Sequence, residues 1–336
     1  MAFVSAMVSG CSRLNLDASS QLAEAQIEPF VTHDGQERIT ASQMEKLSDR
    51  LMRDLDDECL GWFRRRLPWG SYGMLARASI TAPNLRIAMQ RWCRHHALLT
   101  EDIQLVLHEP VNPLDSPATV TLVEANTGSW LHGSMREFCH VSLLRNLLGL
   151  SSWLVDSRIP LINVDLAFSP PTHVDCYPVL FNGHCRFGQA STRMTFDRRY
   201  LDLPLRRDES ALRQMLQRAL PLTVHTYRKD RLLVSRVRQI LLYQPNTLRN
   251  AQLLAEALHL SVRTLHRQLR EEGANLQALK DDVRRERAMD LLLRTTQPIK
   301  KIALAVGFDN DKSFLRAFRT WTGKTPSEVR VQPSDQ

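Results

Sequence analysis

The chain has 336 residues, of which 43% are hydrophobic. This is enough for two or three globular domains, and it excludes bulk disorder. No run of 18 or more apolar residues occurs, which excludes a transmembrane helix. The net charge of +8 falls on the last 106 residues, because Arg231 to Gln336 contain 19 Lys and Arg against 11 Asp and Glu. A neutral region followed by a basic one suggests a sensor joined to a part that attracts nucleic acid.

Residues 1–20 are expected to form a flexible N-terminus. Within them, Val8-Ser9-Gly10-Cys11 resembles the cleavage box of a bacterial lipoprotein. No Lys or Arg precedes this box, and the apolar stretch before it is short. A secretory signal needs both a positive start and a longer apolar segment, so we expect a cytoplasmic protein.

The six cysteines form no CxxC pair, and they are too sparse for a disulfide scaffold. We therefore expect free thiols in a reducing cytoplasm. One cluster suggests zinc, and it consists of His173, Cys176, His184 and Cys185. The adjacent pair His184-Cys185 would point to opposite faces of a strand, so we expect core packing, no bound metal and no cofactor.

Residues 21–220 mix helical and strand periods, which predicts one α+β domain around a single core. Helical stripes occur at 84–96, at 135–148 with Gly149 just past the end, and at 210–220. Strand alternation occurs at 103–107, at 120–122 and at 162–168. The first two strands flank the turn-rich segment 112–117, which predicts a hairpin with a long loop.

Residues 221–230 carry no clear period and are expected to be a linker. The following residues, 231–331, lack a strand signal and are expected to form an all-α DNA-binding domain with two helix-turn-helix units. Ala255 to Ser261 aligns with Ala303 to Asp309. Each copy places a small residue where two helices would cross, then a turn residue four positions later, then a Ser or Asp that could cap the next helix. Gly307 adopts positive φ freely, and His259 is among the residues that tolerate it.

The second helix of each unit is expected at 262–271 and at 311–321. Leu265 and Leu269 would face inward in the first helix, and Phe314 and Phe318 in the second. The outward positions are then Arg263, His266, Arg267, Arg270, Asp311, Lys312, Leu315, Arg316 and Arg319. Arginine can bind guanine bidentately, and such contacts occur where the first turn of a helix enters the major groove.

A helix at 275–293 lies between the two units, with a length of about 28 Å at 1.5 Å per residue. A spacer of this length could place two recognition helices in successive major grooves on one face of the duplex. Charged amphipathic helices also build bundles that bind nothing. Two tandem copies together with all the excess charge favour DNA binding over that alternative.

At these residues the chain resembles the AraC/XylS family of bacterial transcription regulators, over about 100 residues. The most specific part is the run from Gly307 to Trp321, followed by Thr322 to Arg330. The chain departs from the family pattern at His259, where glycine is usual, and at Val329, where an aromatic residue is usual.

The resemblance implies base-reading roles for Arg263, His266 and Arg267 in the first unit and for Lys312, Leu315 and Arg316 in the second. It also places Asp311 at a base-reading position, where it would accept from cytosine or cap the helix, and we favour the cap. Phosphate contacts or capping are assigned to Ser261, Thr264, Asp311 and Arg319.

The N-terminal part is similar to the arabinose-binding-like sensor domain of ornithine-utilisation-type regulators in this family. The matching stretches are 79–85, 168–173, Tyr177, Phe181, 186–188 and 201–205. His173 falls where the family itself often has histidine, which argues further against a metal site. The resemblance does not identify the effector or its pocket residues.

The leading hypothesis is therefore a cytoplasmic regulator whose promoter binding is controlled by a small-molecule effector. It would bind half-sites of double-stranded DNA, contact RNA polymerase and act as an activator, with repression left open. Self-association of the N-terminal domain into a homodimer would pair two such readers, and we expect no partnership with a membrane.

Two other functional classes, an enzyme and a non-specific DNA binder, are alternatives. His95-His96 with Glu101-Asp102 could form an acid/base cluster, but no GxSxG, HExxH, P-loop or GxGxxG motif occurs, so we expect no enzyme. A non-specific, nucleoid-like binder would use phosphate contacts alone. Outward Arg and His residues at helix starts favour a sequence-specific reader instead.

Overall fold

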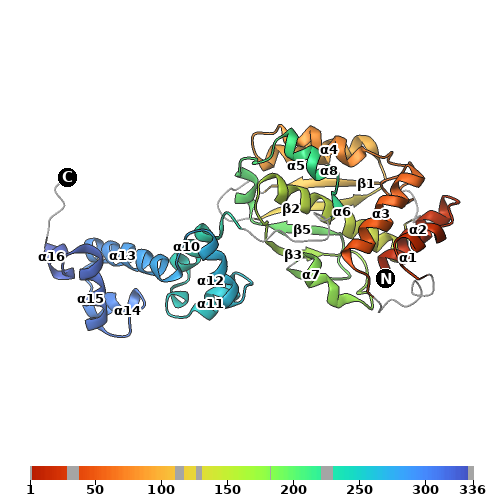
Figure 1. The fold of residues 1–336 in the computed structure, drawn as a ribbon. Helices are drawn as coiled ribbons and strands as arrows, with labels where there is room; N and C mark the ends of the chain where they lie inside the picture. Colours follow the sequence, from red (N-terminus) through yellow and green to blue (C-terminus); the bar gives the residue numbers. More distant parts are fainter. Residues whose placement is uncertain are drawn as a thin grey trace. The chain divides into compact units, whose positions relative to one another are not determined.

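The computed structural model describes residues 2–28, 38–109, 117–125, 131–181, 183–220 and 230–331. The chain divides into two compact units, Met1–Arg228 and Lys229–Gln336 (Figure 1). Residues 221–229 of the expected linker lie outside the described residues, and so do residues 112–116 of the expected hairpin loop. No helix in the described part of the chain is long and apolar enough to cross a bilayer.

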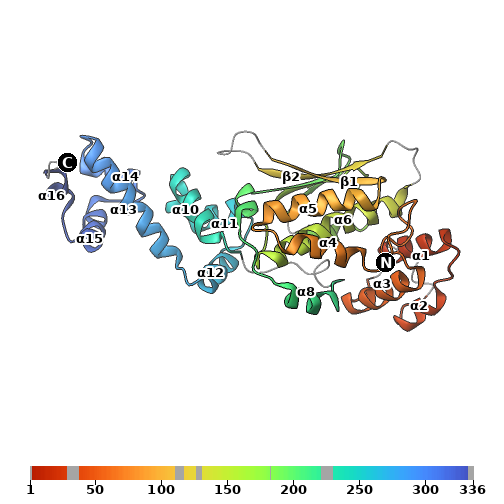
Figure 2. The same cartoon turned by 90° about the horizontal axis from the view of Figure 1, so that it is seen from above.

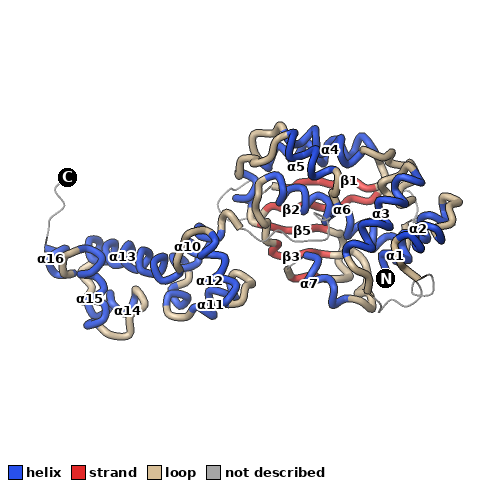
Figure 3. The backbone as a smooth tube through the Cα atoms, in the orientation of Figure 1, coloured by secondary structure: helices blue, strands red, loops and turns tan. Residues whose placement is uncertain are grey.

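The N-terminal unit is built on a mixed sheet with the strand order β1-β2-β5-β3-β4. Figure 3 labels β1, β2, β5 and β3 in this order. The strands are β1 (Ile103–His108), β2 (Ala118–Glu124), β3 (Leu161–Asp165), β4 (His184–Arg186) and β5 (Arg193–Phe196). β3 and β4 run parallel, and the other neighbouring strands are antiparallel. The expected hairpin strands do pair, with Leu105 opposite Leu122. Residues that pair directly across two strands point to the same side of the sheet. Both leucine side chains are buried there.

Helices α4, α5 and α6 lie on one face of this sheet (Figure 2). The helices of the unit are α1 (Ala2–Arg13), α2 (Ser19–Glu24), α3 (Ala41–Leu55), α4 (Ser71–Ile80), α5 (Leu85–Leu99), α6 (Gly133–Leu154), α7 (Tyr177–Phe181) and α8 (Glu209–Leu216), with short 3-10 turns η2 (Val174–Cys176) and η3 (Arg198–Asp202). Asn84 starts α5 by accepting the backbone N–H of Ile87. The stripe expected on α5 is buried, and the helices and sheet together confirm the expected α+β class.

Several element boundaries differ from expectation, and the helix expected at 210–220 ends at Leu216. α6 continues through Gly149 to Leu154, because burial of Leu150 and Leu154 outweighs the cost of about 1 kcal/mol for a glycine inside a helix. The strand expected to reach Phe168 ends at Asp165. The carboxylate of Asp165 accepts hydrogen bonds from Arg186 and Arg193 on the neighbouring strands.

The expectation of a flexible end at residues 1–20 is wrong. α1 packs against α6 and α3, and Val4, Met7 and Cys11 are buried. These three side chains recur at helical spacing and form an apolar stripe that has a core to cover. Gly10 makes the close approach possible, because a Cβ there would lie 1.9 Å from the carbonyl oxygen of Leu60.

The C-terminal unit is all-helical and has two small cores. Its elements are α10 (Leu233–Tyr243), η4 (Pro245–Leu248), α11 (Ala251–Ala257), α12 (Val262–Glu271), α13 (Leu276–Arg294), α14 (Ile299–Ala305), α15 (Asp311–Thr322) and α16 (Pro326–Val331). α13 serves both cores, since Val283 belongs to the first and Ala288 and Leu292 to the second. The expected spacer helix is thus present, one residue out of phase with its predicted bounds.

Candidate DNA-binding interface

The first helix-turn-helix consists of α11 and α12. Ala255 at the crossing is fully buried, and the following turn closes on it through a hydrogen bond from Leu260 N–H to its carbonyl oxygen. His259 adopts a φ of 53°, as its place in the turn predicts. Ser261 Oγ then accepts the backbone N–H of Thr264 at 3.1 Å and begins α12.

The second helix-turn-helix consists of α14 and α15 and repeats this design. Ala303 is fully buried, and Gly307 has a φ of 89°. The expected cap Asp309 is wrong, because Asn310 is the N-cap and its Oδ1 accepts the N–H of Ser313 at 2.8 Å. The capping role expected for Asp311 is therefore also wrong, because Asn310 occupies the N-cap position. Asp311 is the first residue of α15, where its carboxylate accepts the N–H of Lys312 and complements the positive helix end.

The two recognition helices bury one face and expose the other. Leu265 and Leu269 are buried in the first core, and Phe314 and Phe318 in the second. The predicted base-reading residues are all exposed, and they are Arg263, His266, Arg267, Lys312, Leu315 and Arg316. Of the residues assigned to phosphate contact or capping, Ser261, Asp311 and Arg319 are exposed and Thr264 is half-buried. Each exposed set thus lies on one side of its helix, opposite the core.

Two features of these faces affect how they can read bases. Arg267 Nη1 lies 2.8 Å from Glu271 Oε1 one turn later, which holds an otherwise flexible side chain along the helix. Leu315 is 37% exposed, an apolar side chain without a core to cover. Such a group can contact the methyl group of thymine.

Two arginines that the sequence pattern did not single out join the halves of the unit. Arg249, just after η4, donates to the carbonyl oxygens of Leu304 and Phe308 in the second half at 3.0 and 3.4 Å. Arg284 of α13 donates to Leu248 O at 3.0 Å, and its guanidinium lies over the Phe308 ring. The turn of the second helix-turn-helix is therefore anchored on the first. Only tertiary contacts reveal these roles, because both residues look like ordinary surface cations in sequence.

The side chains considered for catalysis do not converge. Asp102 accepts from the backbone N–H and Nε of Arg64 at 2.7 and 2.6 Å. His96 is only 2% exposed, and burial lowers its pKa to about 4, so the ring is neutral at ordinary pH.

The cluster considered for zinc is likewise built into other contacts. His173 Nε2 lies 2.7 Å from Glu137 Oε1, which also accepts the Tyr177 hydroxyl at 2.6 Å. Within the described ranges, no group of three His, Cys, Asp or Glu residues is arranged to hold a metal ion. All six cysteines are free thiols.

The chain is similar to known proteins along most of its length. Residues 254–332 match a helix-turn-helix domain model. The chain is 27% identical to the ornithine utilization regulator of Pseudomonas aeruginosa, over 99% of this chain and 96% of that protein. It is 24% identical to an uncharacterized HTH-type transcriptional regulator of Mycobacterium tuberculosis, over 76% and 74% of the two chains. The crystal structure of the transcriptional regulator CdpR from P. aeruginosa aligns with a TM-score of 0.35 and 20% identity, over 94% of this chain and 96% of that one.

The N-terminal unit carries the wider match. Residues 16–205 match the model described as the arabinose-binding domain of AraC transcription regulators, which is more than half of the chain. The relatives are named as regulators, and neither the family nor its members are enzymes. With an arabinose-binding-like domain followed by tandem helix-turn-helix units, the protein belongs to the AraC family of DNA-binding transcription regulators.

Proposed function

We propose that the protein is a one-component regulator that reads promoter half-sites with α12 and α15 and responds to a small molecule held in its N-terminal unit. The observation that carries the first part is the pair of exposed, arginine-bearing helix faces, each opposite its own core. The unit that holds them also has the entire net charge of the chain, which supplies the non-specific attraction to phosphate.

The two faces favour direct base readout over phosphate contact alone. The predicted base readers lie within the first two turns of each recognition helix. Counted from the N-caps Ser261 and Asn310, the two sets occupy equivalent positions, namely Arg263, His266 and Arg267 in α12 and Lys312, Leu315 and Arg316 in α15. In helix-turn-helix proteins the N-terminal residues of the recognition helix contact base edges. A purely electrostatic binder would have no need for Leu315 at the centre of such a face.

Control by an effector rests on the sensor-type N-terminal unit. A ligand can act only if it binds the active and inactive states with different affinity. The name of the Pseudomonas relative, which resembles this protein over nearly its whole length, supports a role in the use of a small metabolite. We propose activation through contact with RNA polymerase, self-association of the N-terminal units, and a cytoplasmic location.

Selection of binding sites from random duplex DNA tests the reading function. The purified full-length protein is expected to enrich a sequence with two half-sites. Competition in gel shifts should then show a preference for the enriched site over random DNA of roughly 10³-fold or more. A protein that enriches no sequence, and that random DNA displaces equally well, is a nucleoid-like binder instead.

A further inference from the structure

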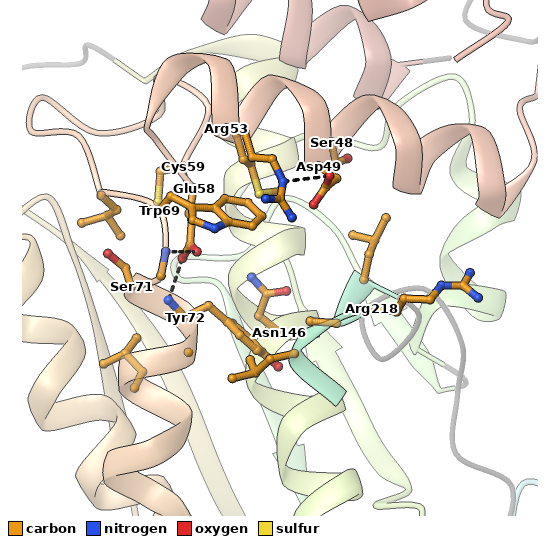
Figure 4. Close-up of a pocket in the computed structure, with 18 of the residues that line it drawn as sticks. Ser48, Asp49, Arg53, Glu58, Cys59, Trp69, Ser71, Tyr72, Asn146 and Arg218 are labelled. Carbon is orange, nitrogen blue, oxygen red and sulfur yellow. Dashed lines mark hydrogen bonds and ion pairs between the residues drawn. The ribbon is translucent and has the colours of Figure 1, made fainter. Parts of the chain in front are cut away.

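The N-terminal unit contains a cavity of about 650 Å³, within the size range of small-molecule sites. It lies between α3, the segment leading into α4, the inner faces of α5 and α6, and residues 216–220 at and after the end of α8. Figure 4 shows Asp49 and Arg53 on α3, Tyr72 at the start of α4, and Arg218 on the opposite side from Trp69.

The inner wall of the cavity is apolar. Leu67, Leu75, Trp92 and Leu143 line it and are each less than one-tenth exposed. Trp69 also lines the cavity and is 41% exposed. The guanidinium of Arg53 lies 4.3 Å from the centre of its ring. Aromatic and aliphatic walls of this kind favour a ligand with an apolar body.

The floor offers no free charge. Glu58 is the acidic residue there, and both its oxygens are engaged by the backbone N–H groups of Gly70 and Tyr72, at 2.7 and 2.6 Å. It thus caps α4, and burial raises its pKa. His96 also lines the cavity and is buried, and neither ring nitrogen has a hydrogen-bond partner. The charged end of a ligand therefore belongs at the rim rather than the floor.

Among the described residues, the rim of the cavity has one cation that no anion neutralises. Arg218 forms a two-pronged pair with Glu45, with Nε to Oε1 at 2.9 Å and Nη2 to Oε2 at 2.6 Å. Arg53 pairs with Asp49 at 3.0 Å, and Arg77 with Glu209 at 3.2 Å. Lys46, exposed on α3 directly after Glu45, lines the cavity and makes no ion pair with any described residue. An ammonium without a partner beside an apolar cavity favours an anionic ligand.

We propose that this cavity is the effector site and that it takes an organic monocarboxylate with an apolar body. The body lies between Trp69, Trp92 and Leu75, and the carboxylate lies at the rim against Lys46 and Arg218. This inference rests on the proposed regulatory function and names the ligand class of its sensor.

The cavity is lined by residues that lie close in sequence to the DNA-binding unit. Arg218 follows α8 by two residues and precedes by three the segment 221–229 that leads to the DNA-binding unit. Its pair with Glu45 ties the residues just before that segment to α3. A ligand carboxylate would compete with Glu45 for Arg218, so occupancy changes what holds residues 217–220 in place.

The test uses full-length protein with octanoate and 4-phenylbutanoate, their primary amides, and octylammonium as probes. Tryptophan fluorescence reports binding, because Trp62, Trp69 and Trp92 line the cavity. We expect saturable binding of at least one acid, and binding of its amide roughly tenfold weaker because the amide loses a charge-assisted contact. Equal binding of acid and amide, tighter binding of octylammonium, or no saturable binding by either acid overturns the proposal.

Two variants locate the site. Lys46→Gln should weaken the acid about fivefold and leave the amide unchanged, as expected for one partly exposed charge pair. Arg50→Gln is the matched control, since Arg50 lies on the same helix outside the cavity and pairs with Asp54 and Glu24. Leu75→Trp should abolish binding by filling the cavity. An acid that binds Lys46→Gln as tightly as the parent overturns the proposal even if Leu75→Trp does not fold.

The regulatory function and the assignment of the cavity can be tested separately. Site-specific DNA binding measured without any carboxylate tests the regulatory function and does not involve the cavity. Carboxylate binding measured by fluorescence needs no DNA. If DNA binding is specific and the acids do not bind, the assignment of the cavity is wrong and the regulator remains.

Discussion

The guanidinium carbon of Arg284 lies 4.9 Å from the centre of the Phe308 ring. Arg284 belongs to the helix shared by both halves of the DNA-binding unit, and Phe308 to the turn of the second half. The same guanidinium donates to Leu248 O in the first half. Together with Arg249, which donates to Leu304 O and Phe308 O, this side chain helps to fix the second recognition helix relative to the first. That arrangement decides whether both helices can reach one face of a duplex.

Removing this anchor should weaken binding to paired half-sites. Arg284→Met keeps the length of the side chain but loses the cation–π contact and the hydrogen bond. We expect about tenfold lower affinity for DNA with two half-sites, with little change for DNA with one, measured by gel shift. Arg285→Met is the control, because Arg285 is about half exposed and pairs only locally with Asp282. Equal behaviour of the two variants would show that Arg284 does not align the halves.

The reading faces make a second prediction. Arg267→Ala and Arg316→Ala should each lose about 1–3 kcal/mol of specific binding and relax the sequence preference at one position. Competition gel shifts against random DNA measure both effects. Arg294→Ala is the control for lost charge, because this 80% exposed arginine of α13 lies outside both reading faces. Full affinity and specificity in both test variants would mean that the reading face is wrong.

Gly307 should be less replaceable than Gly273. Both have positive φ, but a Cβ at Gly307 would lie 3.2 Å from Leu248 Cβ, whereas nothing lies within 4 Å of one at Gly273. Each alanine variant incurs a cost of about 1 kcal/mol for the left-handed conformation, and Gly307→Ala adds a steric cost. Urea unfolding of residues 229–336, which hold their own two cores, measures the difference. A smaller loss for Gly307→Ala than for Gly273→Ala would contradict this contact.

The same fragment should bind DNA with a strong dependence on salt. It carries the chain's whole excess of positive charge, and each phosphate contact releases counterions. We expect non-specific affinity to fall about 100-fold between 50 and 200 mM salt, as for roughly four phosphate contacts. Fluorescence anisotropy with a labelled random duplex measures the slope, and a flat response would refute the electrostatic account.

His96 should make the protein less stable in mild acid. Its folded pKa of about 4 lies below its ordinary value of 6.5, so the unfolded chain binds the proton more tightly. Stability is therefore retained above pH 6.5 and lost as pH falls towards 4, by up to about 3 kcal/mol. His96→Leu should flatten urea midpoints over this range, and exposed His108→Gln should not. An unchanged slope in His96→Leu would place the titration elsewhere.

Much of the DNA-binding unit follows from local pattern. α12 begins and ends where periodicity and the Ser261 cap place it, and Gly307 has the positive φ that its turn requires. For α15 the sequence pattern predicts a cap at Asp309 or at Asp311, one residue to either side of the actual N-cap Asn310. All three side chains can accept an N–H, and only the backbone path distinguishes them.

The remainder depends on tertiary contacts that a sequence does not display. The apolar stripe of α1 is short, so the sequence alone predicts a flexible N-terminus. The stripe is ordered because it packs against α6 and α3. Gly149 predicts a helix end, because the low helix propensity of glycine can be read from the local sequence. The burial of later α6 residues, which outweighs that cost, depends on elements that are distant in sequence. The cavity is lined from segments more than 170 residues apart, such as Ser42 and Arg218, so no local pattern could assemble it.

Hydroxyl-radical footprinting of the full-length protein on a selected site tests the central claim most directly. We expect two protected stretches of DNA backbone, each bordering a major groove, about one duplex turn, or 10.5 base pairs, apart on one face of the DNA. Protection of the first should be lost in Arg267→Ala and of the second in Arg316→Ala. A single protected segment, or two segments on opposite faces of the duplex, would contradict the claim that α12 and α15 read DNA together.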